Sequence, residues 1–165
     1  IDNAAAILSK WPEQRIANIL SEYGEERFAK VIAKEIVEGR SKFKIQRTSD
    51  LVKIIQKAVP SWYCRRKIHC ATRTFQALRI AVNDELRSIE TGVRAACSIL
   101  SPGGKLAVIS FHSLEDRIIK RIFKEKQLRG QVVVLTKKVI RPAHDEIRAN
   151  PKARSAKLRA VQKLL

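Results

Sequence analysis

The segment that most constrains the fold spans residues 101–125, SPGGKLAVISFHSLEDRIIKRIFKE. It opens with a turn at Gly103 and Gly104, continues as an apolar run at residues 106–109, and then becomes polar. A run that is apolar at every position is typical of a strand covered on both faces, as in a parallel sheet. Ser113 and Asp116 match a capping box, so a basic amphipathic helix is expected to begin at the end of the strand.

The neighbouring segments extend this unit into an α/β fold. Apolar residues recur at steps of three and four over residues 72–100 and predict one helix of about 29 residues, roughly 43 Å long. Residues 132–135 are expected to form a second strand, and residues 155–164 a third, with a helix as the alternative for this last segment. Helix, strand and helix form one unit of a doubly wound sheet, but three strands do not complete a Rossmann-type sheet.

The first 60 residues have the periodicity of a small helical bundle. Helices are expected over residues 4–9, 16–23, 28–39 and 48–59. Gly24, Gly39 and Pro60 act as stop signals, and Thr48 or Ser49 is the expected cap of the last helix. This segment contains no obvious catalytic constellation.

The charge of the chain points to a polyanionic partner. The net charge is +18, and residues 117–165 alone carry 15 Lys and Arg against 3 Asp and Glu. Such a concentration favours nucleic acid over a surface that is merely soluble, because each neutralised phosphate releases counterions. The basic residues do not gather on one amphipathic face, and no apolar stretch approaches the ~20 residues of a membrane span. We therefore expect a cytoplasmic protein with no membrane partner.

The segment PSWYCRRKIHC at residues 60–70 joins aromatic and basic side chains. Trp62 and Tyr63 lie beside Arg65, Arg66 and Lys67. Aromatic rings stack on unpaired bases while cations hold phosphates, so this segment is a candidate for single-stranded RNA binding. The alternative is a loop whose aromatic rings pack back onto the bundle.

The three cysteines are interpreted as structural. Cys64, Cys70 and Cys97 are odd in number and scattered, which fits a reducing compartment better than a disulfide framework. Cys64, Cys70 and the intervening His69 lack a fourth ligand at zinc-type spacing, so no metal site is expected.

The polar end of the apolar strand is the strongest candidate for a binding pocket. Ligands of open α/β sheets bind beyond the carboxyl ends of the strands, where residues 110–113 lie. A hydrolase would use Ser110 or Ser113 as nucleophile and His112 as base. We disfavour it because these residues are contiguous and no Gly-x-Ser-x-Gly elbow is present.

Four stretches resemble a known family: SEYGEERFAKVIAKEIVEGR, ATRTFQALRIAVNDEL, LSPGGKLAVISFHSLEDRIIKRIFKE and NPKARSAKLRAVQKL. Together they are similar to the bacterial S-adenosylmethionine-dependent 16S rRNA cytosine-N4 methyltransferases. The resemblance implies a class I methyltransferase (Rossmann-like) sheet in residues 71–165 and an inserted α-helical substrate-recognition domain in residues 1–70. It also implies 16S rRNA of the small ribosomal subunit as partner, with a homodimer as one option for assembly.

The sequence lacks two features of this family that bind the cofactor. The glycine-rich turn after the first strand and the acidic residue for the cofactor ribose are not found; Gly103 and Gly104 precede their strand, whereas a cofactor turn follows one. The chain thus resembles the carboxy-terminal half of the enzyme. We expect the catalytic residues and most of the S-adenosylmethionine site in an absent amino-terminal half, and this chain alone to be inactive. The alternative is a non-catalytic rRNA-binding adaptor. Cys70 also stands where the family usually has proline.

The resemblance assigns roles to particular side chains. It implies a target-base pocket formed by Ser110, Phe111, His112 and Ser113. It implies RNA contacts from a larger set: Arg65, Arg66, Lys67, Arg73, Arg79, Arg117, Lys120, Arg121, Arg154, Ser155 and Lys157. For Arg154, Ser155 and Lys157, the rim of the pocket is the alternative. The exocyclic amine of cytosine is a weak nucleophile, so catalysis is expected to rest on positioning an unstacked base and excluding water.

Overall fold

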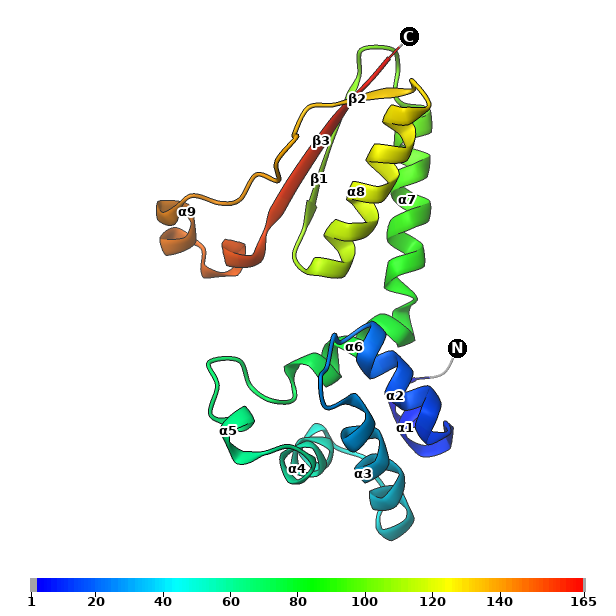
Figure 1. Cartoon of the computed structure of the whole chain (residues 1–165), viewed down its shortest axis with the longest axis vertical. Coiled ribbons are helices and arrows are strands. Elements are labelled where there is room, and N and C mark those ends of the chain that lie inside the picture. The colour runs from blue at the N-terminus through cyan, green and yellow to red at the C-terminus, as the bar shows by residue number, and fades with distance from the viewer. Residues whose placement is uncertain (1–2, 165) are drawn as a thin grey trace. The chain divides into compact units, whose positions relative to one another are not determined.

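The computed structural model describes residues 3–164, and the chain forms two compact units, Ile1–Glu85 and Leu86–Leu165 (Figure 1). The first unit is helical, and the second combines helices with one sheet. The expected domain boundary at residue 70 falls inside the first unit, because the helix after residue 70 buries Ala77 and Leu78 in the helical core. The assignment of the two units to a recognition domain and a methyltransferase domain stays a prediction.

The helical unit confirms the bundle predicted from periodicity. Its helices are α1 (Ala4–Lys10), α2 (Glu13–Glu22), α3 (Ala29–Lys42), α4 (Thr48–Ala58), α5 (Ser61–Cys64) and α6 (Thr72–Asn83). The predicted apolar faces meet in one core, in which Ile16, Leu20, Ile32, Ile36 and Ile55 are fully buried. Burying a side chain of this size stabilises the fold by about 1.5–3 kcal/mol, which explains why the 3.6-residue period alone locates these helices.

Two helix ends of the bundle differ from the expectation. α3 continues through Gly39 to Lys42, and a Cβ atom at Gly39 would lie 3.2 Å from Cδ1 of Ile54. This glycine therefore permits a close approach of α3 and α4 and does not end a helix. α4 begins at Thr48, preceded by Arg47 as N-cap residue, and Oδ2 of Asp50 accepts the Arg47 N–H at 2.9 Å. The expected cap at Thr48 or Ser49 is wrong, because the Asp50 carboxylate satisfies the first backbone donor instead.

The single helix expected over residues 72–100 is also wrong. Two helices, α6 and α7 (Glu85–Ile99), occupy this stretch. Asp84 between them adopts a left-handed conformation with a φ of 48°, which ends α6. Aspartate reaches this conformation more readily than most residues. The apolar pattern runs through the break without interruption and so gives no warning of it.

The α/β unit contains a three-stranded antiparallel sheet in the order β1-β3-β2. Its further elements are β1 (Lys105–Ser110), α8 (Ser113–Leu128), β2 (Val132–Val134), α9 (His144–Ala149), the 3₁₀ helix η1 (Pro151–Ser155) and β3 (Lys157–Lys163). The strands predicted at 132–135 and 155–164 are confirmed, and the helical alternative for the last segment is wrong. Val93 and Cys97 of α7 pack with Ile122 and Phe123 of α8 on the sheet residue Val161.

The apolar strand β1 does not lie in a parallel sheet covered on both faces. Within residues 3–164 it is an edge strand, antiparallel to β3, and its burial alternates along the chain. Leu106 and Val108 pack toward α7 and α8, whereas Ile109 is 56% exposed. Val133, which lies on the same side of the sheet as Ile109, is also exposed, as is Leu135 just after β2. Helices thus cover one face, and an apolar face stays open.

Candidate nucleic-acid interface and strand-tip site

The turn from β1 into α8 is built by His112 and Glu115. Oε2 of Glu115 accepts the backbone N–H groups of Phe111 at 2.7 Å and His112 at 3.1 Å, and Nδ1 of His112 accepts the Glu115 N–H at 3.4 Å. This reciprocal arrangement is a capping box with histidine at the N-cap position. The capping pair expected from sequence, Ser113 with Asp116, is wrong, although the helix does begin at Ser113.

The carboxyl group of Glu115 has a pKa well below its usual value. Burial raises its pKa, but the adjacent His112 imidazole and the two backbone N–H donors outweigh burial and lower the pKa to about 2. The ionised carboxylate therefore holds the turn after β1 at neutral pH.

Asp116 forms an ion pair that the sequence pattern does not reveal. Arg159 of β3 donates from Nε to Oδ1 at 2.6 Å and from a terminal nitrogen to Oδ2 at 3.1 Å. Both side chains are largely buried, and the hydrogen bonds from Arg159 lower the pKa of Asp116. This bidentate pair connects the first turn of α8 to the middle strand of the sheet.

Three residues of the expected target-base pocket, Ser110, Phe111 and His112, occupy different environments, and the fourth, Ser113, begins α8. Ser110 is buried, and its Oγ donates to the Lys157 carbonyl at 3.5 Å, whereas the ring of Phe111 is 54% exposed. The Nε2 atom of His112 is buried without a hydrogen bond in the described part of the chain, 3.2 Å from Oε1 of Glu115. At the strand tip, the Phe111 ring is thus exposed to solvent, whereas the Nε2 atom of the neighbouring His112 is buried. Their role toward a base stays a prediction.

The strand tip does not assemble a serine hydrolase relay from Ser110 and His112. The hydroxyl of Ser110 is directed at the Lys157 carbonyl, and Nδ1 of His112 is engaged by the helix N-terminus. A nucleophile and its base need a direct hydrogen bond, which this arrangement does not provide.

The predicted RNA-binding segment of the helical unit is divided between surface and core. Residues 65–69 are exposed, and the Arg66 guanidinium lies 5.3 Å from the Tyr63 ring centroid. Tyr63 itself is buried and donates its hydroxyl hydrogen bond to Glu26 at 2.8 Å; burial and this carboxylate raise its pKa to about 12. Trp62 is 49% exposed, but its ring packs edge-on against Phe28 and Tyr63, and the Arg27 guanidinium lies 5.3 Å from its centroid.

Two predicted RNA contacts on α6 already bind groups of the helical unit. Arg73 donates to the Glu25 carbonyl. Arg79 forms a bidentate pair with Glu85 at 2.8 and 3.0 Å, in which the Arg79 side chain is 56% exposed. These contacts orient the guanidinium groups, and a phosphate would have to compete with them.

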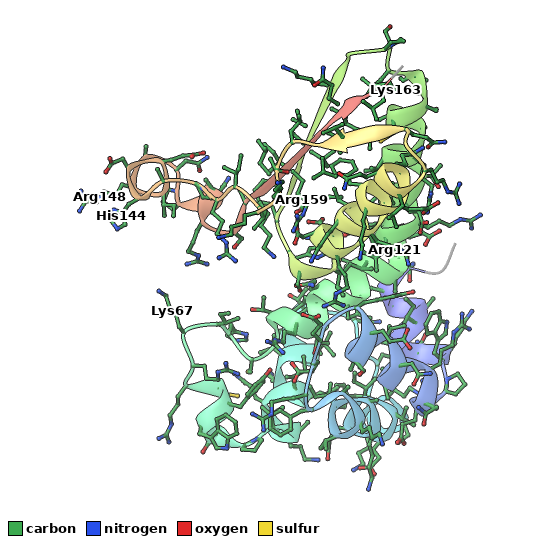
Figure 2. All side chains as sticks on the ribbon, turned by 45° about the horizontal axis from the view of Figure 1, so that its top comes forward. Lys67, Arg121, His144, Arg148, Arg159 and Lys163 are labelled. Carbon is green, nitrogen blue, oxygen red and sulfur yellow. The ribbon has the colours of Figure 1, made fainter. Side chains whose placement is uncertain are left out.

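A basic cleft lies between α8, the end of β2 and β3. Its volume is about 310 Å³, and its cations are Lys120, Lys124, Lys137 and Arg159 (Figure 2 labels Arg159). Phe123 forms an apolar part of the wall. The sequence predicted Lys120 as an RNA contact and places Lys124 on the same basic helix face, but it gave no sign of Lys137 and Arg159, which reach the cleft only through the antiparallel order of the sheet.

The remaining predicted contacts are distributed over the α/β unit. Arg117 and Arg121 lie on α8, and Arg121 pairs with Glu90 of α7 at 2.9 Å. Arg154 and Ser155 are exposed on η1. Lys157 lies opposite Ser110 in the register of β1 and β3, so this residue is adjacent to the strand tip; its role toward RNA stays a prediction.

Two classes of site find no support in the described residues. Among residues 3–164, no group of three or more His, Cys, Asp and Glu side chains is placed to hold a metal ion. None of the helices between residues 3 and 164 is both long and apolar enough to cross a membrane.

The fold and this surface define a basic α/β protein with an attached helical unit. The chain belongs to the MraW methylase family, whose sequence model matches residues 1–164. It is similar to the ribosomal RNA small subunit methyltransferase H of Heliobacterium modesticaldum, with 49% identity over 98% of this chain and 56% of that protein. The protein of the same name from Synechocystis sp. is 52% identical over 98% of this chain and 51% of its own length. The chain thus spans about half the length of these curated relatives.

Proposed function

We propose that this chain is the rRNA-contacting part of a cytoplasmic methyltransferase that modifies N4 of a cytosine in 16S rRNA of the small ribosomal subunit. The observation that carries the proposal is the methylase-family match over residues 1–164, together with relatives named as ribosomal RNA small subunit methyltransferases. A basic cleft on the α/β unit supplies the charge that an RNA backbone requires.

The open side of the sheet supports the proposal that the rest of a class I methyltransferase sheet lies outside this chain. β1 pairs on one side only in the described residues, and Ile109 is exposed on the uncovered face. A strand edge and an apolar face of this kind favour association with further structure. The relatives are nearly twice as long as this chain, and we expect their additional residues to form the rest of the sheet.

The described residues do not fit a complete site for a methyl donor of the S-adenosylmethionine type. Gly103 donates its N–H to the Lys163 carbonyl, and a Cβ at Gly104 would lie 2.8 Å from the Ser101 carbonyl oxygen. The glycine turn is therefore used to begin β1 and makes no cradle after a strand. We assign the donor site and the catalytic residues to the part of the protein beyond this chain, and we expect this chain alone to be inactive.

The residues of this chain act on the RNA in this proposal. The exposed ring of Phe111 stacks on the unstacked target base, and the buried groups of Ser110 and His112 shape the wall beneath it. The lysines of the basic cleft hold the phosphates that flank the base. Catalysis follows from holding the weakly nucleophilic amine in position and from excluding water.

A triple substitution of the cleft lysines tests the RNA contact. Lys120→Gln, Lys124→Gln and Lys137→Gln together are expected to weaken binding to small-subunit rRNA at least about tenfold, measured by fluorescence anisotropy at physiological salt. The slope of log affinity against log salt concentration is expected to fall by about 2, since each single-stranded phosphate contact contributes about 0.7.

Lys57→Gln is the matched control, because Lys57 is an exposed lysine of the helical unit that is paired with Glu35 at 2.8 Å and is not among the predicted RNA contacts. It is expected to leave affinity within about twofold of the parent chain. Equal affinity and equal salt dependence of the triple variant and the parent chain would contradict the assignment of the cleft to RNA.

A non-catalytic rRNA-binding adaptor is the second candidate function. The basic cleft favours it, together with a glycine turn that forms no donor cradle. An adaptor would show the same dependence on the cleft lysines, but the protein produced from the native gene would transfer no methyl group.

A further inference from the structure

Cys64 and Cys70 form a pair of thiols on either side of the exposed basic loop of residues 65–69. Cys64 ends α5, Cys70 precedes α6, and their Sγ atoms lie 3.0 Å apart without a bond between them. Cys64 is partly exposed and Cys70 is buried. Three exposed cations, Arg65, Arg66 and Lys67, occupy the loop between the two thiols.

We propose that Cys64 and Cys70 are a site of reversible disulfide formation that closes the basic loop into a ring. A disulfide bond is about 2.05 Å long, so the sulfur atoms need to approach by only about 1 Å. The loop joining them is short and flanked by two helices, which holds the thiols at high effective concentration.

The oxidant is a low-molecular-weight disulfide such as glutathione disulfide. The Cys64 thiolate, the more accessible of the two, attacks one sulfur of the oxidant and releases one glutathione thiolate, which takes up a proton. Cys70 then loses its proton and attacks the Cys64 sulfur of the mixed disulfide, and the second glutathione leaves as its thiol. Two electrons pass from the protein thiols to the oxidant, one disulfide bond breaks and one forms.

Burial is consistent with this order of attack. Burial and the neighbouring Cys64 sulfur raise the pKa of Cys70 to about 11, so Cys70 is almost wholly protonated at neutral pH. It therefore acts second, where its closeness to the Cys64 sulfur compensates for its low thiolate fraction.

Closing the loop with a disulfide is expected to change the affinity for rRNA, an expectation that rests on the proposed function. Closing the loop restricts the backbone that carries Arg65, Arg66 and Lys67 without a large change in position. A loop that is already ordered loses less entropy on binding, so the oxidised chain is expected to bind small-subunit rRNA about threefold more tightly.

Peptide mapping after oxidation tests the disulfide directly. The full chain is treated with glutathione disulfide, its remaining thiols are alkylated under denaturing conditions, and it is digested with trypsin. Because trypsin cleaves after Arg65, Arg66 and Lys67, the disulfide is expected to join two separate peptides, residues 58–65 and 68–73. Before alkylation, the intact mass is expected to fall by about 2 Da, and after alkylation Cys97 is expected to be the one modified cysteine.

Two variants complete the test. Cys64→Ser is expected to abolish the linked peptides and leave Cys70 and Cys97 to be alkylated. Cys97→Ser, which changes a buried thiol of the other unit, is expected to retain the linked peptides. Three alkylated cysteines after oxidation of the parent chain, or a persistent glutathione adduct on Cys64, would overturn the proposed disulfide.

RNA binding is measured separately on the reduced and the oxidised chain. Equal affinities would overturn the effect of the ring on RNA while the linked peptides still established the disulfide. Failure of both forms to bind small-subunit rRNA would count against the proposed function and not against the disulfide.

Discussion

Replacing Arg159 by methionine is expected to lower the free energy of unfolding of the α/β unit by about 3 kcal/mol. Arg159 and Asp116 are 11% and 16% exposed and share two hydrogen bonds. Removing the guanidinium leaves the Asp116 carboxylate largely buried without its partner, and this uncompensated charge accounts for most of the loss. Urea denaturation followed by circular dichroism measures the change.

Arg121→Met is the matched control for this experiment. Arg121 also joins two elements of the α/β unit, but its side chain is 63% exposed in its pair with Glu90. Solvent screening limits such a pair to less than about 1 kcal/mol, so Arg121→Met is expected to change stability little. A loss at Arg159 no greater than that at Arg121 would show that the pair with Asp116 is not a structural link between α8 and β3.

The acid sensitivity of the α/β unit is expected to depend on Glu115. The pKa of this carboxyl falls from 4.5 to about 2 on folding, so its contribution is complete above pH 4.5 and is lost as the pH falls toward 2. The full shift corresponds to about 3 kcal/mol, and partial solvation of the turn reduces the expected loss to about 2 kcal/mol. Glu115→Gln should be less stable at pH 7 and should lack this component of the acid-induced loss.

The free energy of unfolding is measured at pH 2, 3, 4, 5 and 7 for the parent chain, Glu115→Gln and a control variant. Glu146→Gln provides the control, because Glu146 is an exposed carboxylate on α9 of the same unit. The curves of the parent chain and Glu115→Gln are expected to converge below pH 4.5, whereas the curve of Glu146→Gln follows that of the parent chain. A constant difference between the parent chain and Glu115→Gln at every pH would contradict the role of the ionised carboxylate.

Helices and strands were predictable where burial follows a simple period. Ile16, Leu20 and Ile32 occur at helical spacing and are all fully buried, so amphipathicity located the bundle. The strand at 157–163 was predicted from its alternation, whereas the strand at 132–134 was predicted from a short, continuously apolar run. The break at Asp84 was not predictable, because a single left-handed residue leaves the apolar spacing almost unchanged.

The position of β1 in the sheet depends on information outside its own sequence. Residues 106–109 are apolar enough for a strand covered on both faces, yet Ile109 is exposed and β1 is at an edge. The composition of a strand reports the environment it is suited to, and in residues 3–164 only one face of this sheet is covered. The mismatch is consistent with relatives of about twice the length.

The candidate site was only partly predictable from the chain order. The strand tip and Lys120 stand out locally, as a polar end to an apolar run and as part of a basic helical face. Arg159 and Lys137 join the cleft through tertiary contacts, and no local pattern pairs Arg159 with Asp116, 43 residues earlier. Histidine is also an unusual N-cap residue, which led to the wrong capping pair at Ser113 and Asp116.

The most direct test of the central claim is methyl transfer to isolated small ribosomal subunits by the protein produced from the native gene. Unmodified subunits are incubated with S-adenosylmethionine, the rRNA is digested to nucleosides, and N4-methylcytidine is measured by mass spectrometry. We predict N4-methylcytidine with the native protein and none with residues 1–165 alone. Methyl transfer by residues 1–165, or none by the native protein, would contradict the account.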